Sequence, residues 1–193
     1  MAEPLQPPLF VLAAPFSGSS WLAGVLGQHP QLYALPQLFA FTAETVGELL
    51  DVFGLSQADH GDGLRRAVAQ LIFGAQSDRT IAEADAWLAE RAALSVKALI
   101  DLLAAAAAPR RLVIPDSEAA LRPMELRRLL AAYPEAAVVH LVRHPWVQGC
   151  HLASWLQARL FVPVDYRDYA FNPPAAEPQI PWFRANSNLE QAL

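Results

Sequence analysis

One stretch of the sequence, residues 9–30, constrains the fold more than any other. Its letters are LFVLAAPFSGSSWLAGVLGQHP. The apolar run at 9–13 predicts a buried strand, the small residues at 15–20 predict a turn, and residues 21–27 predict a helix. In such a unit the backbone N–H groups of the turn point into one concavity, and the helix dipole adds positive potential. The stretch therefore predicts an anion-binding loop at the start of an α/β domain.

A simpler interpretation of residues 15–20 is a tight turn whose serines only cap the following helix. We favour the anion site because Ser-Gly-Ser-Ser carries more hydrogen-bond donors than one cap requires. Phe16, within the same turn, is typical of an aromatic residue in the core or at its rim.

Strands and helices alternate along the rest of the chain. Residues 112–114 and 136–142 predict two further strands, so we expect three strands in a small sheet. Apolar residues at helical spacing predict one long helix over 80–108. This alternation predicts a three-layer α/β fold with a mostly parallel sheet covered on both faces. We expect a loose, proline-rich leader at 1–8 and a single domain at 9–193.

Charge and composition exclude several classes of function. The net charge of -5 argues against a nucleic-acid partner, which would need a basic face. No apolar run reaches the ~20 residues of a membrane span, and no signal-peptide pattern is visible, so we expect a cytoplasmic protein without a membrane partner. The single cysteine, Cys150, allows no internal disulfide and no cysteine cluster for a metal, and we expect it to be a small buried hydrophobe. Because Lys97 is the only lysine, a lysine-dependent phosphate site is disfavoured.

A second candidate anion site follows the strand at 136–142. Arg143 comes directly after that strand and before a predicted helix, where its guanidinium can form paired hydrogen bonds with a phosphate. The simpler interpretation is a solvated arginine at a strand end. In parallel α/β sheets, however, ligands bind outside the carboxyl ends of the strands. The 15–20 loop and Arg143 together therefore predict a ligand with two separated phosphates.

Other polar residues in the strands and at their ends have simpler interpretations. His140 lies inside a predicted strand, and we expect it to be packed and hydrogen-bonded in the core. Asp116 and Ser117 are typical of helix caps or turn formers, with contact to a substrate as the less favoured alternative.

These residues resemble two motifs of the sulfotransferases that use 3'-phosphoadenosine 5'-phosphosulfate (PAPS). The first family motif, a strand followed by Pro-Arg/Lys-Ser-Gly-Ser/Thr-Ser/Thr-Leu/Trp, is matched by PFSGSSW at 15–21. The second, a strand ending in Leu-Val-Arg-x-Pro, is matched by LVRHP at 141–145. The resemblance covers residues 9–193 and is strongest to bacterial sulfotransferases and to sulfotransferase domains of polyketide assembly lines. It implies a P-loop-like sulfotransferase fold.

The resemblance implies that the chain moves a sulfuryl group from PAPS to a hydroxyl of a small molecule or a carrier-bound acyl chain, without a metal. It places the 5'-phosphosulfate on the 15–20 loop and the 3'-phosphate against Arg143. His151 stands where the family has a serine that holds the same phosphate. The implied nucleotide-binding residues are Ser17, Gly18, Ser19, Ser20, Trp21, Arg143 and His151.

Departures from the family pattern affect the implied catalysis. Phe16 replaces a lysine or arginine that stabilises charge on the bridging oxygen, and losing one such donor typically costs ~10²–10³ in rate. Gln37 lies near the position of a glutamate that serves as general base in many bacterial members, and an amide cannot take that role. The family's C-terminal loop over the adenosine has no counterpart here, so the resemblance predicts a fold incomplete at its C-terminus.

These departures keep an alternative open: a degenerate or truncated homologue that binds a nucleotide or a partner without catalysis. A P-loop kinase or NTPase is disfavoured, because the loop lacks the Gly-Lys-Ser/Thr ending that holds the β- and γ-phosphates and Mg²⁺.

Overall fold

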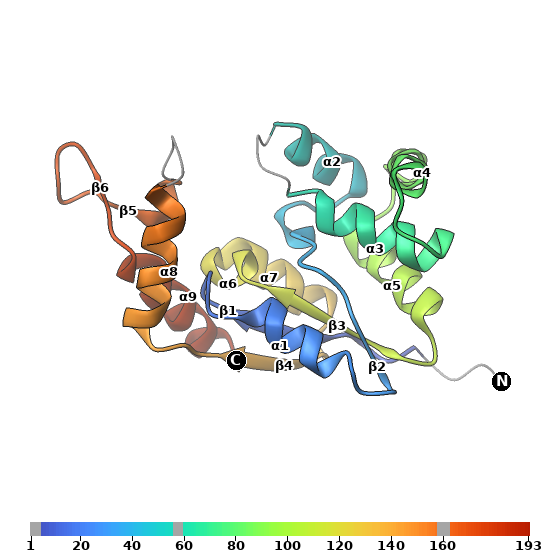
Figure 1. Ribbon diagram of the computed structural model, residues 1–193, viewed down its shortest axis with the longest axis horizontal. Helices are drawn as coiled ribbons and strands as arrows, with labels where there is room; N and C mark the ends of the chain where they lie inside the picture. The colour runs from blue at the N-terminus through green and yellow to red at the C-terminus, as the bar shows by residue number, and fades with distance from the viewer. Residues whose placement is uncertain (1–4, 56–59, 158–162) are drawn as a thin grey trace.

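A four-stranded parallel sheet forms the centre of the chain (Figure 1). The computed structural model describes residues 5–55, 60–157 and 163–193. The strands, in the spatial order β2-β3-β1-β4, are β1 (Leu9–Ala13), β2 (Leu32–Ala34), β3 (Arg111–Asp116) and β4 (Ala137–Leu141). The three predicted strands are confirmed as β1, β3 and β4. The expectation of only three was wrong, because β2 has three residues, too few to show an alternating pattern.

Helices account for most of the remaining described residues. Their bounds are α1 (Ser19–Leu26), α2 (Val46–Leu55), α3 (Asp62–Phe73), α4 (Asp78–Ala89), α5 (Val96–Ala107), α6 (Glu118–Leu121), α7 (Pro123–Ala132), α8 (Pro145–Gln157) and α9 (Gln179–Ala192). Short 3-10 turns occur at η1 (Ala40–Thr42) and η2 (Val164–Tyr166).

The sheet is covered on both faces, as predicted for a three-layer α/β fold. Successive residues of a strand point to opposite faces. Val11 packs with Ala23 of α1 on one face, whereas Phe10 and Leu12 join the larger core on the other. That larger core is completed by α5, α6, α7 and α9, and Figure 1 shows α1 and α7 on opposite sides of the strands. Because all four strands are parallel, their carboxyl ends lie at one edge.

The predicted helix over 80–108 is two helices, α4 and α5, so that prediction was wrong. Between them, Val46 N donates to Leu94 O and Val96 N donates to Glu44 O, both at 2.9 Å. Ser95 Oγ then accepts from Ala98 N at 3.1 Å and caps α5. Alanine-rich sequence favours a continuous helix locally, but these backbone bonds to the start of α2 interrupt it.

Prolines and tyrosines are frequent in residues 162–181 and predict a long loop or lid, but the described part of this segment contains regular structure. η2 is followed by an antiparallel pair, β5 (Arg167–Asp168) and β6 (Ala175–Ala176). α9 begins at Gln179 and packs against α6 and α8. The sequence predicts a helix over 146–160 before this segment, and the last residues of that helix, 158–160, lie outside the described residues.

Two further predictions concern Cys150 and the proline-rich leader. Cys150 is exposed on α8, so its prediction as a buried residue was wrong. The low amphipathicity of α8 leaves no pattern from which its exposed face could be predicted. Residues 1–4 of the predicted leader lie outside the described residues, whereas the carbonyls of Pro7 and Pro8 accept from Arg111 at 2.6 and 3.3 Å.

Candidate functional site

The loop between β1 and α1 has the backbone of an anion-binding turn. Phe16 and Gly18 have φ values of 64° and 95°, and Ser17 N donates to Ala14 O at 3.1 Å. The N-cap of α1 is Gly18, so no serine serves as the cap. A positive φ is favourable for a glycine such as Gly18, but it costs conformational energy for a residue with a side chain such as Phe16. The first-turn N–H groups of α1 are consequently available to an anion.

Ser17 adds an unusual donor to this loop. The residue is only 7% exposed, and its Oγ is buried without a hydrogen-bond partner among the described residues. Buried hydroxyl groups are normally paired, because an unsatisfied one costs about 1–3 kcal/mol. An anionic oxygen bound by the loop would satisfy it, so the donor set fits a phosphate or sulfate group.

Arg143 and His151 lie beside the same loop. Arg143 follows β4, and its Nη1 donates to Phe16 O at 3.1 Å, while its Nη2 lies 3.1 Å from Nε2 of His151 on α8. Trp182 Nε1 donates to Arg143 O at 2.8 Å and fixes the backbone there. Arg143 is 127 positions from Phe16 in the sequence, and the parallel pairing of β1 with β4 brings the two together.

Gln148 is a contact that the sequence did not indicate. It is fully buried on α8, one turn before His151, and its Nε2 donates to Pro15 O at 2.8 Å. Its Oε1 is buried without a partner among the described residues. Gln148 thus holds the backbone at the start of the loop through its hydrogen bond to Pro15 O. Its i, i+3 spacing from His151 is the signal that could have indicated it.

A cavity of about 470 Å³ opens over the loop. Five residues of the loop line it: Pro15, Phe16, Gly18, Ser19 and Ser20. The other lining residues come from more distant parts of the chain: Gln37, Phe39, His60, Ser117, Glu118, Arg122, Trp155, Pro163 and Tyr166. Two of these lining residues are hydrogen-bonded to each other: Gln37 Nε2 donates to Ser117 Oγ at 2.9 Å. The residues that line the cavity do not include Arg143, His151 or Trp21. Trp21 is exposed to solvent, with 74% of its surface accessible.

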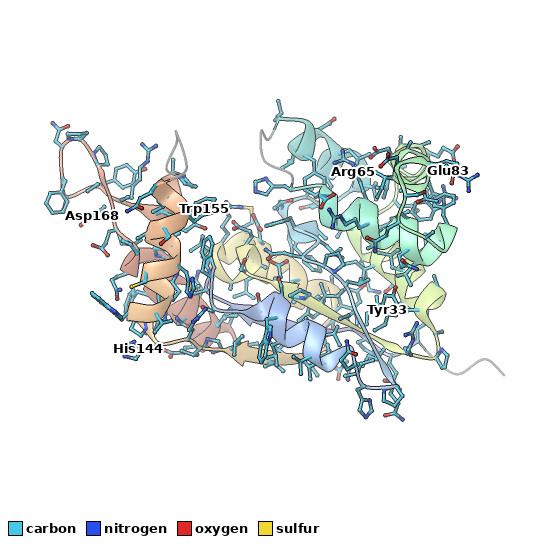
Figure 2. The ribbon with its side chains drawn as sticks, viewed as in Figure 1. Tyr33, Arg65, Glu83, His144, Trp155 and Asp168 are labelled. Atoms are coloured by element: carbon cyan, nitrogen blue, oxygen red, sulfur yellow. The ribbon has the colours of Figure 1, made fainter. Side chains whose placement is uncertain are left out.

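One wall of this cavity is aromatic. The ring of Phe16 lies 5.5 Å from that of Trp155, which in turn lies 6.2 Å from that of Tyr166. Trp155 projects from α8 toward the middle of the molecule (Figure 2). Phe16 therefore presents an apolar surface where the resemblance expects a cation, and its packing explains how the chain tolerates the substitution.

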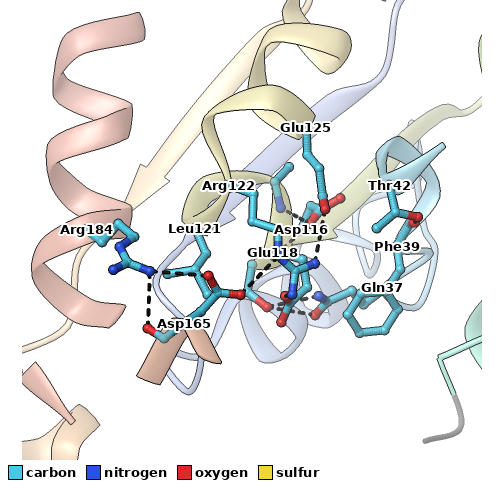
Figure 3. Close-up of polar contacts among 12 residues, drawn as sticks. Gln37, Phe39, Thr42, Asp116, Glu118, Leu121, Arg122, Glu125, Asp165 and Arg184 are labelled. Carbon is cyan, nitrogen blue, oxygen red and sulfur yellow. Dashed lines mark hydrogen bonds and ion pairs between the residues drawn. The ribbon is translucent and has the colours of Figure 1, made fainter. Parts of the chain in front are cut away.

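Another part of the cavity lining carries a charged cluster centred on Arg122 (Figure 3). Its guanidinium lies 3.1 Å from Glu118, 3.0 Å from Glu125 and 3.2 Å from Asp165. Arg184 of α9 pairs with the same Asp165 at 3.2 Å. The cluster joins α6, α7, η2 and α9 and holds Glu118 at the edge of the cavity.

Burial shifts the pKa of the acids near this wall. Desolvation raises the pKa of Glu118, and the neighbouring Arg122 offsets part of that rise. Asp116, at the end of β3, is 2% exposed, and burial raises its pKa to about 7 although its carboxylate accepts from Ala119 N. Asp116 therefore caps α6, as predicted. Ser117 makes no such cap bond and faces Gln37 instead.

His140 behaves as predicted for a packed histidine. Its Nε2 lies 2.9 Å from Asn186 Oδ1 on α9. In the part of the chain that the structure describes, no group of three or more histidine, cysteine or acidic side chains could hold a metal ion. No helix among the described residues is long and apolar enough to cross a membrane.

A parallel α/β sheet with a glycine-containing loop after its first strand, beside an arginine after a neighbouring strand, is an arrangement typical of anion sites in α/β proteins. The sulfotransferase family model matches residues 7–190. The chain therefore belongs to the sulfotransferase family. No curated protein matches the sequence.

Two solved structures share the fold. The sulfotransferase domain from the Synechococcus PCC 7002 olefin synthase has a TM-score of 0.76 and 24% identity, covering 98% of this chain and 62% of its own. The sulfotransferase domain from the curacin biosynthetic pathway has a TM-score of 0.74 and 22% identity, covering 99% of this chain and 64% of its own. This chain thus spans less than two thirds of the length of either structure.

Proposed function

We propose that the chain transfers a sulfuryl group from PAPS to a hydroxyl of a small molecule or a carrier-bound acyl chain. The observation that carries this proposal is that the two candidate anion sites, the 15–20 loop and Arg143, lie next to each other. The loop at 15–20, with the unpaired hydroxyl of Ser17, lies in hydrogen-bond contact with Arg143, which in turn contacts His151. Two adjacent sites fit a nucleotide with separated phosphates, and membership of the family favours transfer over nucleotide binding alone.

In this proposal each group has a distinct part. The phosphosulfate occupies the loop, held by the first-turn N–H groups of α1 and the hydroxyls of Ser17 and Ser19. Arg143 and His151 bind the 3'-phosphate by charge-assisted hydrogen bonds. The exposed indole of Trp21 offers a flat surface on which the adenine base stacks. The protein would then act mainly by positioning and charge stabilisation, as in phosphoryl transfer.

The acceptor half of the proposal rests on the cavity over the loop and on the similar structures. Both of those are domains of biosynthetic systems, an olefin synthase and the curacin pathway. A biosynthetic hydroxyl compound, free or attached to a carrier, is therefore the proposed acceptor. Because Phe16 supplies no positive charge to the bridging oxygen, we expect transfer slower by ~10²–10³ than with a cation there.

Calorimetric titration with 3'-phosphoadenosine 5'-phosphate and with adenosine 5'-phosphate tests the nucleotide site. We expect the first ligand to bind more tightly, because only it carries the 3'-phosphate. Arg143→Ala should weaken its binding by about 10–100-fold, as expected for a lost hydrogen bond between charged groups, and remove the preference between the ligands. Ser17→Ala should weaken both ligands by about tenfold.

Arg110→Ala provides the matched control. It removes the same charge, but Arg110 stacks on Tyr33 at the amino end of β3, away from the loop. Its binding of both ligands should equal that of the wild type. Absence of binding by the wild type, or equal weakening by the two arginine variants, would contradict the proposed function.

A further inference from the structure

A second cavity adjoins the one over the loop. It measures about 330 Å³ and shares four lining residues with the first: Phe39, His60, Glu118 and Arg122. Its other lining residues come from η1 and α2 and are mostly apolar: Thr42, Val52, Phe53 and Leu55. A ligand in this cavity would have an apolar part against α2 and one end at the shared wall. That wall also faces the anion-binding loop.

Glu118 is the carboxylate among the four shared residues. It begins α6 directly after β3, and Asp116 holds its backbone N–H at 3.0 Å. Since β3 pairs with β1 in parallel, this position lies at the same edge of the sheet as the loop. The side chain is 15% exposed, and its Oε2 lies 3.1 Å from Arg122 Nη2. The position of Glu118 is thus fixed by its backbone and by an ion pair.

The other groups around the junction are less suited to accept a proton. Arg122 is a permanent cation. The amide of Gln37 is not basic, and it is already hydrogen-bonded to Ser117. The His60 ring packs edge-on against Phe39 at 4.8 Å and is the competing candidate. Figure 3 shows Glu118, Gln37 and Phe39 gathered on this side of Arg122.

We propose that Glu118 accepts the proton of the acceptor hydroxyl while the second cavity holds an unbranched apolar chain of that acceptor. This inference rests on the proposed function. In the step, the acceptor oxygen forms a bond to the sulfur of PAPS, and the bond from sulfur to the 5'-phosphate oxygen breaks. The electron pair of that bond leaves with the 5'-phosphate, and the acceptor proton moves to the Glu118 carboxylate. Solvent then removes the proton.

The electrostatic surroundings support a proton acceptor at this position. Burial raises the pKa of the Glu118 carboxyl above its ordinary value, which makes the carboxylate a stronger base, and Arg122 offsets part of that rise. Glu125 and Asp165 raise the pKa further. The remaining titratable groups at this wall are Asp116, His60, Tyr166 and Arg184.

The test uses PAPS with 1-octanol and with ethanol as probe acceptors, and mass spectrometry to measure the alkyl sulfate. For the wild type we expect a KM for 1-octanol at least tenfold below that for ethanol, because each buried methylene favours binding. Glu118→Gln should lower kcat for 1-octanol by about 100-fold or more. It should leave the affinity for 3'-phosphoadenosine 5'-phosphate unchanged. In the wild type, kcat should rise with pH as Glu118 ionises, and Glu118→Gln should remove that rise.

Glu125→Gln is the matched control. Glu125 pairs with the same arginine at 3.0 Å and is buried, but it does not line either cavity. Its kcat should stay within about threefold of the wild type, a change too small for a lost general base. If Glu125→Gln lowers kcat as much as Glu118→Gln, or if His60→Asn alone abolishes transfer, the inference is wrong.

The inference and the proposed function fail in different ways. A wild type that does not bind 3'-phosphoadenosine 5'-phosphate contradicts the proposed function. A wild type that binds it but sulfates neither alcohol, or sulfates ethanol as efficiently as 1-octanol, overturns the inference about Glu118 and the second cavity. The nucleotide site would then still stand.

Discussion

Asp116, the last residue of β3, is subject to two opposing influences. Its Oδ1 accepts from the backbone N–H groups of Glu118 and Ala119 at 3.0 and 2.9 Å, and these bonds favour the ionised form. Burial favours the neutral form and is the larger effect, so the pKa rises from 3.8 to about 7. The folded chain therefore binds this proton more tightly than the unfolded chain does.

Asp116→Asn should remove a pH dependence of stability. Between pH 4 and pH 7 the folded state keeps a proton on Asp116 that the unfolded state has lost, so this group destabilises the fold increasingly as pH rises. Asparagine retains the Oδ1 acceptor and does not titrate. We expect urea denaturation to show the variant gaining stability over the wild type from pH 4 to pH 8, by at most about 4 kcal/mol. A difference that is constant with pH would contradict the shifted pKa.

Phe16 stands where the family motif has a lysine or arginine, and its contacts show how the loop accommodates the aromatic residue. Its backbone has a positive φ, its carbonyl accepts from Arg143, and its ring packs against Trp155. The loop geometry therefore survives without the cation of the family motif. What the substitution removes is charge, which affects the chemical step more than the shape of the anion site.

Among the elements, α3 lies unusually close to the segment that follows β2. Gly63 is in the first turn of α3, and a Cβ added there would lie 2.0 Å from the carbonyl oxygen of Gln37. Only glycine permits this approach. The contact holds Gln37, and with it the wall of the cavity over the loop, against the helical layer formed by α2 to α5.

Gly63→Ala should separate these two segments, because neither backbone can yield easily. We expect the free energy of unfolding to fall by about 1–3 kcal/mol, the usual range for forcing an atom into a packed site. Gly54→Ala in α2 is the control, since its added Cβ meets nothing within 4 Å. That change should stabilise the protein by about 0.5–1 kcal/mol through helix propensity. Equal effects of the two changes in thermal denaturation would contradict the close packing.

In the molecule as a whole, the C-terminal segment is joined to the sheet by polar contacts as well as by its apolar core residues. Asp165 of η2 pairs with Arg122 and with Arg184, and His140 of β4 lies 2.9 Å from Asn186 of α9. These contacts connect α9 and η2 to α6 and to the edge strand β4. They also orient the wall that carries Glu118.

Asp165→Asn should weaken this connection. The change preserves the shape of the side chain but removes the charge shared by two arginines, so we expect a loss of about 1–2 kcal/mol in stability. Amide hydrogen exchange should increase in α9 more than in β1. Glu83→Gln, which breaks the exposed pair with Arg79, serves as the control and should change stability by about 0.5 kcal/mol or less. Equal losses for the two variants would show that the cluster is not part of the connection.

The three long strands and the loop were predictable because their signals are local. A buried strand needs only consecutive apolar residues, and the turn needs small residues with a glycine at a positive φ. The strand β2 and the break between α4 and α5 were not predictable. β2 is too short for a pattern, and the break depends on backbone bonds from Glu44 and Val46, residues that are distant in sequence.

The candidate site divides in the same way. The sequence by itself determined the loop at 15–20 and the arginine after the strand, because each belongs to one short motif and parallel strands bring such ends to one edge. Only the tertiary structure decided what faces the loop. Gln37 meets Ser117 across 80 residues, and Arg122 meets Asp165 across 43. The part of the cavity lining that contains Glu118, and the second cavity beside it, arise from the packing of separate elements. Such packing produces no local sequence pattern in any one element.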